Sequence, residues 1–252
     1  MMIQFGSSIY MILGTKELVD DERLWREEFI VPGLCDISAG TNAAGSLTKW
    51  YRNTIFPDAL ELEQNGGPDA YITMMQDLDK IPVGSDGLIT LPYFAGERTP
   101  INDPLARGGI LFGLTLAHTR QHMYRSALES VAYSVNQQLK IMLEHDVPID
   151  QIFAVGGGVK NDLWMQIVAD VTGKEISTPP AITVGASFGD ALMAASGIKY
   201  SGFESFNKLT DFIKPGKTYH PNKENHEAYK KYQNIYDSLY PATVNLMHCL
   251  SD

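Results

Sequence analysis

The strongest constraint on the fold is a short stretch in which four apolar residues, Ile152–Val155, are followed at once by three glycines. A helical pattern comes next, with apolar residues on one side at Leu163, Trp164, Ile167, Val168 and Val171. The order is therefore a buried strand, a glycine turn and a helix. Because glycine has no Cβ and a helix start carries unpaired N–H groups, such a turn can lie against a flat or anionic ligand.

The spacing of these glycines excludes two common nucleotide motifs. Gly156-x-Gly158-x-x-Asn161 lacks the third glycine of the dinucleotide fingerprint, and no acidic residue ends a second strand about twenty positions on. The phosphate-binding loop G-x-x-x-x-G-K-[ST] is absent from the whole chain. On the glycines alone, a tight turn without a ligand and a ligand-binding turn of another kind both stay open.

Length, charge and cysteine content narrow the class of protein. The chain has 252 residues, enough for one large domain or two small ones, and its formal charge of −10 argues against nucleic acid or an anionic membrane as a partner. With two cysteines, no signal peptide and no apolar run of about 18 residues, the expected location is the cytoplasm. The chain opens on Met1-Met2-Ile3-Gln4-Phe5, which resembles a strand already under way, so we expect a fragment.

Hydrophobic periodicity predicts the order of elements. Strands are expected within residues 2–13 on either side of Gly6-Ser7-Ser8, and at 29–32, 36–40, 88–91, 152–155 and 175–178. Helices are expected from Gly45 through Trp50, at 70–80 and 118–145, between the glycine turn and a C-cap at Gly173, from Gly185 onward, and at 222–240. Residues 56–67 are acidic and predicted to be irregular, 99–109 to be a loop, and 203–212 a short helix or turn.

Several spaced motifs resemble one protein family. The segment G-G-G-V-K-N at 156–161, with Trp164, Gln166 and Ala169-Asp170, resembles the adenosine-binding segment of the FGGY carbohydrate kinases. L-P-Y-F-A-G-E-R-T-P at 91–100, followed by N-D-P, A-R-G and F-G-L motifs, resembles the xylulokinase and gluconate-kinase branch of that family. With R-S-A-L-E-S-V-A at 125–132, the resemblance covers nearly the whole chain.

The resemblance implies a fold and a reaction. The expected fold is α/β and ribonuclease-H-like, as in the actin/hexokinase-like ATPases, with a mixed sheet flanked by helices. Residues 1–252 would form the C-terminal nucleotide-binding domain of an enzyme that moves the γ-phosphate of ATP, with Mg²⁺, to a hydroxyl of a ketopentose such as xylulose or a sugar acid such as gluconate. The catalytic aspartate and the sugar-binding N-terminal domain would lie upstream of Met1, so no catalytic residue is assigned and the chain alone is expected to be inactive.

The resemblance also implies nucleotide contacts near the N-terminus. Gly6 and Ser7 would lie under the β- and γ-phosphates, where hydroxyl and N–H donors suit an anion; the alternative is a plain hairpin turn. Gly45 and Lys49 match, by position, a glycine and a polar residue that contact nucleotide in related kinases. The alternative for Lys49 is a solvated lysine on a helix face.

Further contacts are implied at the glycine turn and in the second strand. Gly157, in the same turn as Gly158, would lie under the adenine or ribose, and Asn161 would bond the base; Asn161 also suits a helix N-cap, and both roles are compatible. Tyr10 matches an aromatic residue that lines the sugar cleft in some relatives, with core packing as the alternative. Glu97 and Arg98 are expected to form a salt bridge that orders their loop.

Other classes of function stay open. The chain could be a stand-alone, non-catalytic nucleotide-binding module, or a homodimer, as related kinases often are. Residues 185–189 fit the G-x-S-x-G nucleophile elbow of hydrolases, with Ser187 followed by Asp211 and His220, but Pro179-Pro180 interrupts the strand that should precede it. His118 and His122 are four residues apart on a predicted helix but lack the glutamate of H-E-x-x-H, so no metal ligand is assigned.

Overall fold

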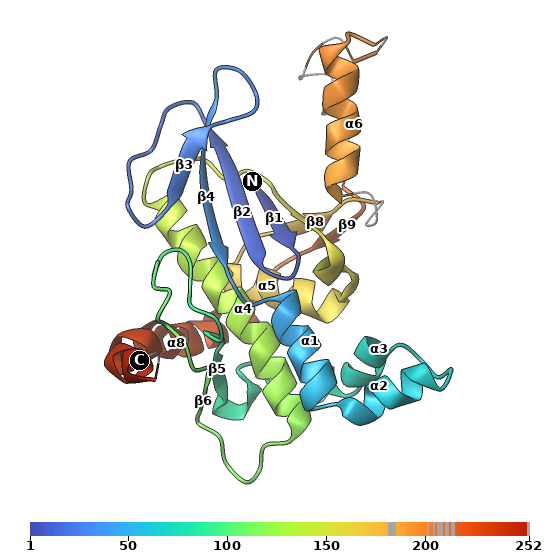
Figure 1. The fold of residues 1–252 in the computed structure, drawn as a ribbon, viewed down its shortest axis with the longest axis vertical. Coiled ribbons are helices and arrows are strands. Elements are labelled where there is room, and N and C mark those ends of the chain that lie inside the picture. The colour runs from blue at the N-terminus through green and yellow to red at the C-terminus, as the bar shows by residue number, and fades with distance from the viewer. Residues whose placement is uncertain are drawn as a thin grey trace.

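The computed structural model describes residues 1–180, 185–200, 202–203, 205, 209, 212 and 215–250. Within these ranges, the centre of the molecule is a mixed sheet with the strand order β3-β4-β2-β1-β7-β8-β9 (Figure 1). Its strands are β1 (Met2–Phe5), β2 (Ile9–Thr15), β3 (Trp25–Glu28), β4 (Cys35–Thr41), β7 (Ile152–Val155), β8 (Ile176–Thr178) and β9 (Lys217–Tyr219). The first four pair antiparallel, β7 and β8 run parallel to β1, and β9 is antiparallel to β8.

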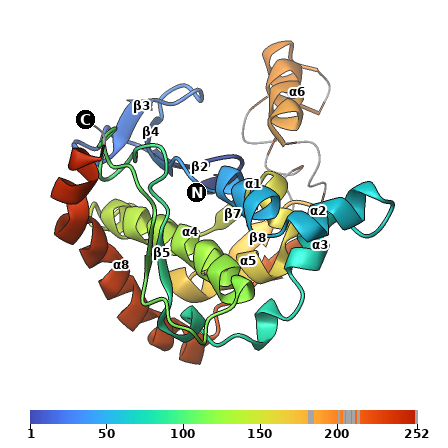
Figure 2. The same ribbon diagram turned by 60° about the horizontal axis from the view of Figure 1, so that its bottom comes forward.

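Helices flank this sheet (Figure 1). The two that pack together beneath it are α4 (Arg120–Leu143) and α5 (Asp162–Thr172), and α8 (Lys223–Cys249) lies outside them (Figure 2). Smaller elements are α1 (Gly45–Thr54), α2 (Pro57–Gln64), α3 (Ala70–Met74), the 3-10 turns η1 (Leu78–Lys80), η2 (Ser85–Gly87) and η3 (Gly157–Lys160), and the hairpin β5 (Ile89–Leu91) with β6 (Ile110–Phe112). Helix α6 (Gly185–Gly197) stands apart from the sheet in both views (Figures 1 and 2).

Strand alternation divides the sheet into two unlike faces. Ile3, Phe5, Ile9 and Met11 are fully buried, and they form one hydrophobic core with the inner side of α4 and α5. Their neighbours in sequence, such as Gln4 and Tyr10, point the other way and keep some exposure. The predicted α/β fold, a mixed sheet flanked by helices, is confirmed.

Several predicted elements are placed differently in the structure. Residues 29–32 are not a strand: the strand is β3, and the chain turns after it, with Phe29 N–H donating to the Leu34 carbonyl oxygen at 3.0 Å. Pattern reading missed β3 because Arg26, Glu27 and Glu28 are charged, which an exposed edge strand tolerates.

Three helical regions also differ from the prediction. Residues 57–64 form α2 rather than an irregular segment, because Pro57 suits the first helical position and Asp58 the first turn. The helix predicted at 70–80 ends at Met74, and Asp77 has a left-handed φ of 63° that breaks it from η1. Helix α8 continues past Pro241 to Cys249 because its apolar side extends to the buried Met247. Most of the predicted element at 203–212 lies outside the described residues.

Candidate functional site

The hairpin turn between β1 and β2 lies directly on the start of α1. The amide N–H of Gly45 donates to the Gly6 carbonyl oxygen at 3.0 Å, and the N–H groups of Ala44 and Ser46 both donate to the Ser7 carbonyl oxygen, at 3.1 and 3.0 Å. A Cβ on Gly45 would lie 2.5 Å from the Gly6 oxygen, closer than any side chain allows. Gly45 is therefore needed so that the turn and the helix can touch, and the turn occupies the N–H groups that a helix start would offer an anion.

The second glycine turn packs against the end of the same strand. Gly156 has a left-handed φ of 97°, and a Cβ there would lie 2.5 Å from the Phe5 carbonyl oxygen. A Cβ on Gly158 would lie 2.8 Å from the Phe5 Cβ. Because β1 and β7 are adjacent and parallel, their carboxyl ends share one sheet edge. The two turns, 6–8 and 156–158, are thus brought together with the start of α1.

Gly157 differs from the other glycines of this cluster. It is exposed, its φ is not left-handed, and an added Cβ would meet nothing within 4 Å. Packing therefore gives no reason for a glycine there. Ser7 is likewise exposed at the neighbouring turn, and within the described residues its hydroxyl makes no hydrogen bond.

Asn161 closes the glycine turn as the N-cap of α5. Its side-chain oxygen accepts a hydrogen bond from the Trp164 N–H at 3.0 Å, which confirms the capping role. Its amide nitrogen lies 3.1 Å from the Met75 sulfur, at the end of α3. The amide therefore faces the space between α3 and the glycine turn. One of its N–H groups points at the sulfur, which is a weak acceptor, and the second N–H is left for another partner.

Lys49 and Tyr10 lie on elements other than that turn. Lys49 is exposed on α1, one helical turn after Gly45. Tyr10 is partly buried on the sheet face opposite the core, and its ring stacks on Trp25 with centroids 6.3 Å apart and planes 23° apart. Core packing thus does not account for Tyr10.

The loop at 95–103 is fastened to β4 by a buried carboxylate. One oxygen of Glu97 accepts bonds from the N–H groups of Arg98 (2.7 Å) and Asn42 (3.2 Å), and the other accepts from the Thr41 hydroxyl (2.8 Å). The expected Glu97–Arg98 salt bridge is wrong, because Arg98 contributes its backbone and its guanidinium lies over the Trp25 ring at 6.0 Å. Burial raises the pKa of Glu97 to about 7.

A second buried carboxylate, which the sequence did not single out, ties α4 to α8 and η2. Glu129 is 1% exposed and accepts hydrogen bonds at 3.0 Å from Arg125 Nε, Gly84 N–H and the Tyr229 hydroxyl, and at 2.8 Å from the Ser85 hydroxyl. The available signal was an Arg and a Glu four residues apart on the long helix predicted at 118–145. With every oxygen satisfied, this cluster is structural.

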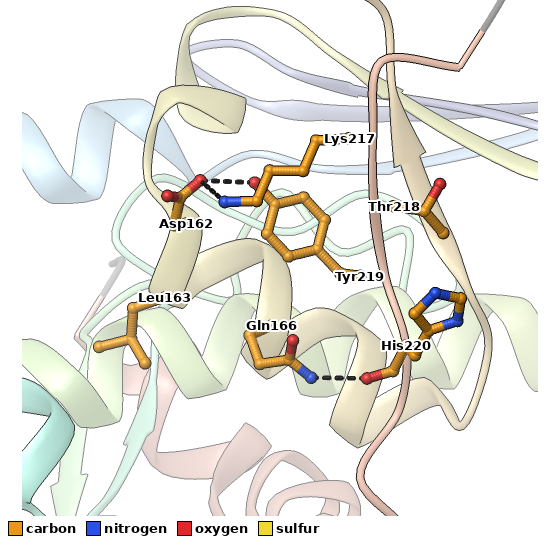
Figure 3. A pocket seen from close by; sticks show the side chains of 7 residues that line it. All are labelled: Asp162, Leu163, Gln166, Lys217, Thr218, Tyr219 and His220. Atoms are coloured by element: carbon orange, nitrogen blue, oxygen red, sulfur yellow. Dashed lines mark hydrogen bonds and ion pairs between the residues drawn. The ribbon is translucent and has the colours of Figure 1, made fainter.

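A surface pocket of about 490 Å³ lies between α5 and β9, and two of its lining residues, Asp162 and Leu163, directly follow Asn161 (Figure 3). Inside it, Asp162 accepts a hydrogen bond from the Tyr219 hydroxyl at 2.6 Å and pairs with the Lys217 ammonium at 2.8 Å. The Lys217 hydrogen bond, followed by that of Tyr219, lowers the pKa of Asp162. The polar groups that line this pocket are thus largely paired with one another.

The hydrolase and metal hypotheses gain no support from the described residues. Ser187 is exposed in the first turn of α6, Asp211 lies outside the described residues, and His220 Nδ1 bonds Glu175 at 2.8 Å. His118 and His122 stack edge to face at 5.4 Å, but no group of three or more His, Cys, Asp or Glu side chains in these ranges could hold a metal ion. In the same part of the chain, no helix is both long and apolar enough to cross a bilayer.

Comparison with known proteins gives one consistent family. The family model described as "FGGY family of carbohydrate kinases, C-terminal domain" matches residues 1–198. A xylulose kinase of Staphylococcus xylosus is 32% identical over 83% of this chain and 41% of its own length, and a gluconokinase of Bacillus subtilis is 30% identical over 86% and 40%. The crystal structure of a xylulose kinase from Rhodospirillum rubrum superposes with a TM-score of 0.82 at 29% identity, covering 98% of this chain and 48% of that one. The chain thus spans less than half the length of these relatives.

Proposed function

The chain belongs to the FGGY family of carbohydrate kinases, and on that premise we propose that residues 1–252 form the nucleotide-binding part of an ATP-dependent sugar kinase. The acceptor is proposed to be a ketopentose such as xylulose or a sugar acid such as gluconate, since relatives named for each are about equally similar. In this proposal a sugar-binding domain, in the position of the relatives' remaining length, completes the enzyme.

The observation that carries the proposal is the meeting of the two glycine turns and the start of α1 around the end of β1. Packing accounts for Gly45, Gly156 and Gly158, whereas Gly157 stays bare with open space above it. Exposed backbone without a Cβ suits a flat base or ribose. The exposed hydroxyl of Ser7 suits a phosphate oxygen.

These residues fit an adenine nucleotide in a definite order. The β- and γ-phosphates would lie on Gly6 and Ser7, with Lys49 one helical turn beyond Gly45 as a cation in reach. The adenosine would lie on Gly157, with the free N–H of the Asn161 amide donating to a ring nitrogen. When bound, ATP with Mg²⁺ would supply the phosphoryl group.

The proposal assigns no general base to this chain. Phosphoryl transfer needs the acceptor hydroxyl held in line with the γ-phosphate, which requires groups on both sides of the cleft. We therefore propose that the chain alone binds nucleotide weakly and does not turn over. Location in the cytoplasm, where ATP is available, and assembly as a homodimer belong to the same proposal.

Calorimetric titration with ADP and Mg²⁺ tests the nucleotide site. Gly157→Ala is expected to weaken ADP binding at least tenfold, because its methyl group would occupy the ligand's space. It should not lower the thermal unfolding midpoint, since nothing lies within 4 Å of the new Cβ. The matched control is Gly14→Ala on β2, another glycine with open space around its Cβ, which should change neither quantity.

Two results would contradict the proposal. One is the absence of any ADP binding by the wild-type chain at millimolar concentration. The other is an ADP affinity of Gly157→Ala equal to that of the wild type and of Gly14→Ala.

A further inference from the structure

We propose that Trp25 and Arg98 extend Tyr10 into a platform for the acceptor sugar, on the sheet face that the core helices leave open. This inference rests on the proposed kinase function and adds two contacts that the sequence did not assign. The platform is defined by the side chains of Tyr10 (β2), Trp25 (β3) and Arg98 (the loop at 95–103).

Strand register places the two rings on one face. Tyr10 pairs with Gly40 across β2 and β4, while Trp25 pairs with Ser38, two residues before Gly40 on the same strand. Residues two apart on a strand share a face, so both rings stand on the side opposite Ile9 and Met11. Between the two rings, Gly40 allows β4 to lie close to β2, because a Cβ there would lie 2.6 Å from the Ile9 carbonyl oxygen.

An anchored backbone holds Arg98 over the Trp25 ring. Next to Trp25, where β3 begins, the Thr99 hydroxyl continues the sheet edge along β4. It accepts from the Gly40 N–H at 2.7 Å and donates to the Gly40 carbonyl oxygen at 3.2 Å. The Glu97 carboxylate accepts hydrogen bonds from the N–H groups of Arg98 and Asn42, which fixes the backbone of Arg98 against β4. The exposed guanidinium lies over Trp25 at 6.0 Å and forms no ion pair within the described residues. A cation is thus held over Trp25, one of the two partly exposed rings.

The chemistry of the three groups fits a sugar. Aromatic ring faces carry partial negative charge and attract the polarised C–H bonds on one side of a polyol. A guanidinium presents several N–H donors that bond hydroxyl or carboxylate oxygens. With centroids 6.3 Å apart, the two rings can be contacted at once by a chain of five or six carbons.

The position relative to the proposed phosphate turn supports the same ligand. Tyr10 follows Ser7 by three residues, so their Cα atoms are at most about 10 Å apart. An acceptor hydroxyl must come close to the γ-phosphate in any phosphoryl transfer. A molecule seated on Tyr10 meets that condition, with Trp25 and Arg98 contacting its distal end.

Fluorescence titration of the full chain tests the platform, with xylulose and sodium gluconate as separate probes. Each effective probe should quench the wild-type emission in a saturable way, and Trp25→Phe should remove most of that quenching. Trp50→Phe is the matched control, because Trp50 is a partly exposed tryptophan on α1 that packs on Phe94 rather than on Tyr10 or Arg98. It should leave the sugar-dependent quenching in place.

Affinity measurements on the same chain complete the test. By saturation-transfer NMR, Trp25→Ala should weaken sugar binding about tenfold, Trp25→Phe less, and Arg98→Gln should weaken gluconate more than xylulose. Far-UV circular dichroism establishes that each variant is folded. Sugar binding that is absent from the wild type, or unchanged in Trp25→Ala, would overturn the platform.

Nucleotide binding separates this inference from the proposed function. The Trp25 variants should bind ADP as the wild type does, because Trp25 lies on an edge strand away from the glycine turns. ADP binding without sugar binding would refute the platform alone. Trp25-dependent sugar binding without ADP binding would refute the nucleotide site alone.

Discussion

Replacing Glu97 by glutamine should change the pH dependence of stability in a defined direction. The Glu97 side chain is 5% exposed, and burial raises its pKa from an ordinary 4.5 to about 7. Between these two values the folded protein holds a proton that the unfolded chain releases. The free energy of unfolding therefore falls as pH rises through this window.

The size of the effect follows from the same two values. A change of carboxyl pKa from 4.5 to about 7 corresponds to about 3 kcal/mol, which is fully lost above pH 7 and fully present below 4.5. Glutamine keeps the geometry: its oxygen can accept from the N–H groups of Arg98 and Asn42, and its amide can donate to the Thr41 hydroxyl. Glu97→Gln should match the wild type near pH 4.5 and exceed its stability by up to about 3 kcal/mol near pH 8.

Urea unfolding at several pH values, followed by far-UV circular dichroism, measures this difference. Other carboxyls with raised pKa, such as Asp36 and Asp237, contribute to both proteins and cancel in the comparison. Glu28→Gln, on the exposed side of β3, controls for the loss of one negative charge. Parallel stability curves for the wild type and Glu97→Gln, or a variant that is less stable than the wild type at pH 8, would refute the reasoning.

Three further substitutions test the packing of the site. Glu129→Ala leaves the buried Arg125 guanidinium without its carboxylate and should cost about 3–5 kcal/mol in urea unfolding; a loss below about 1 kcal/mol would contradict it. Gly45→Ala brings a Cβ within 2.5 Å of the Gly6 oxygen and should cost about 1–3 kcal/mol as well as weaken ADP binding, whereas Gly157→Ala should weaken ADP binding without a loss of stability. Asn161→Ala removes the cap of α5 and should lower stability by about 1 kcal/mol in thermal unfolding, whereas an unchanged midpoint would argue against the cap.

Local chemistry made part of this structure predictable from the sequence. The strands on either side of Gly6-Ser7-Ser8 follow from alternation, and the C-cap at Gly173, with its left-handed φ of 66°, follows from the conformational freedom of glycine. The cap formed by Asn161 was foreseen for the same reason, since the bond spans only three residues. Each of these features is decided by neighbours in the chain.

Features that depend on distant partners were not predictable in the same way. The strand β3 was hidden because its exposed charges belong to a sheet edge, a position that only the assembled sheet defines. The partners of Glu97 were misassigned because two of its three donors come from Thr41 and Asn42, more than fifty residues away. For Gly45 the sequence predicts a ligand contact, and the assembled structure adds a second reason for a glycine there, its close contact with Gly6.

The nucleotide part and the acceptor part of the proposed site are built from different kinds of groups, so that mutations can affect them separately. Gly45, Gly156 and Gly158 are fixed by contacts with Gly6 and Phe5, so that any side chain there disturbs the fold before it affects a ligand. The nucleotide part of the proposed site is therefore built mainly of backbone and is hard to retune. Tyr10, Trp25 and Arg98 instead meet through side chains on an open sheet face, where a substitution leaves the strand pairing intact. Choice of acceptor should consequently change through these three positions while nucleotide affinity stays constant.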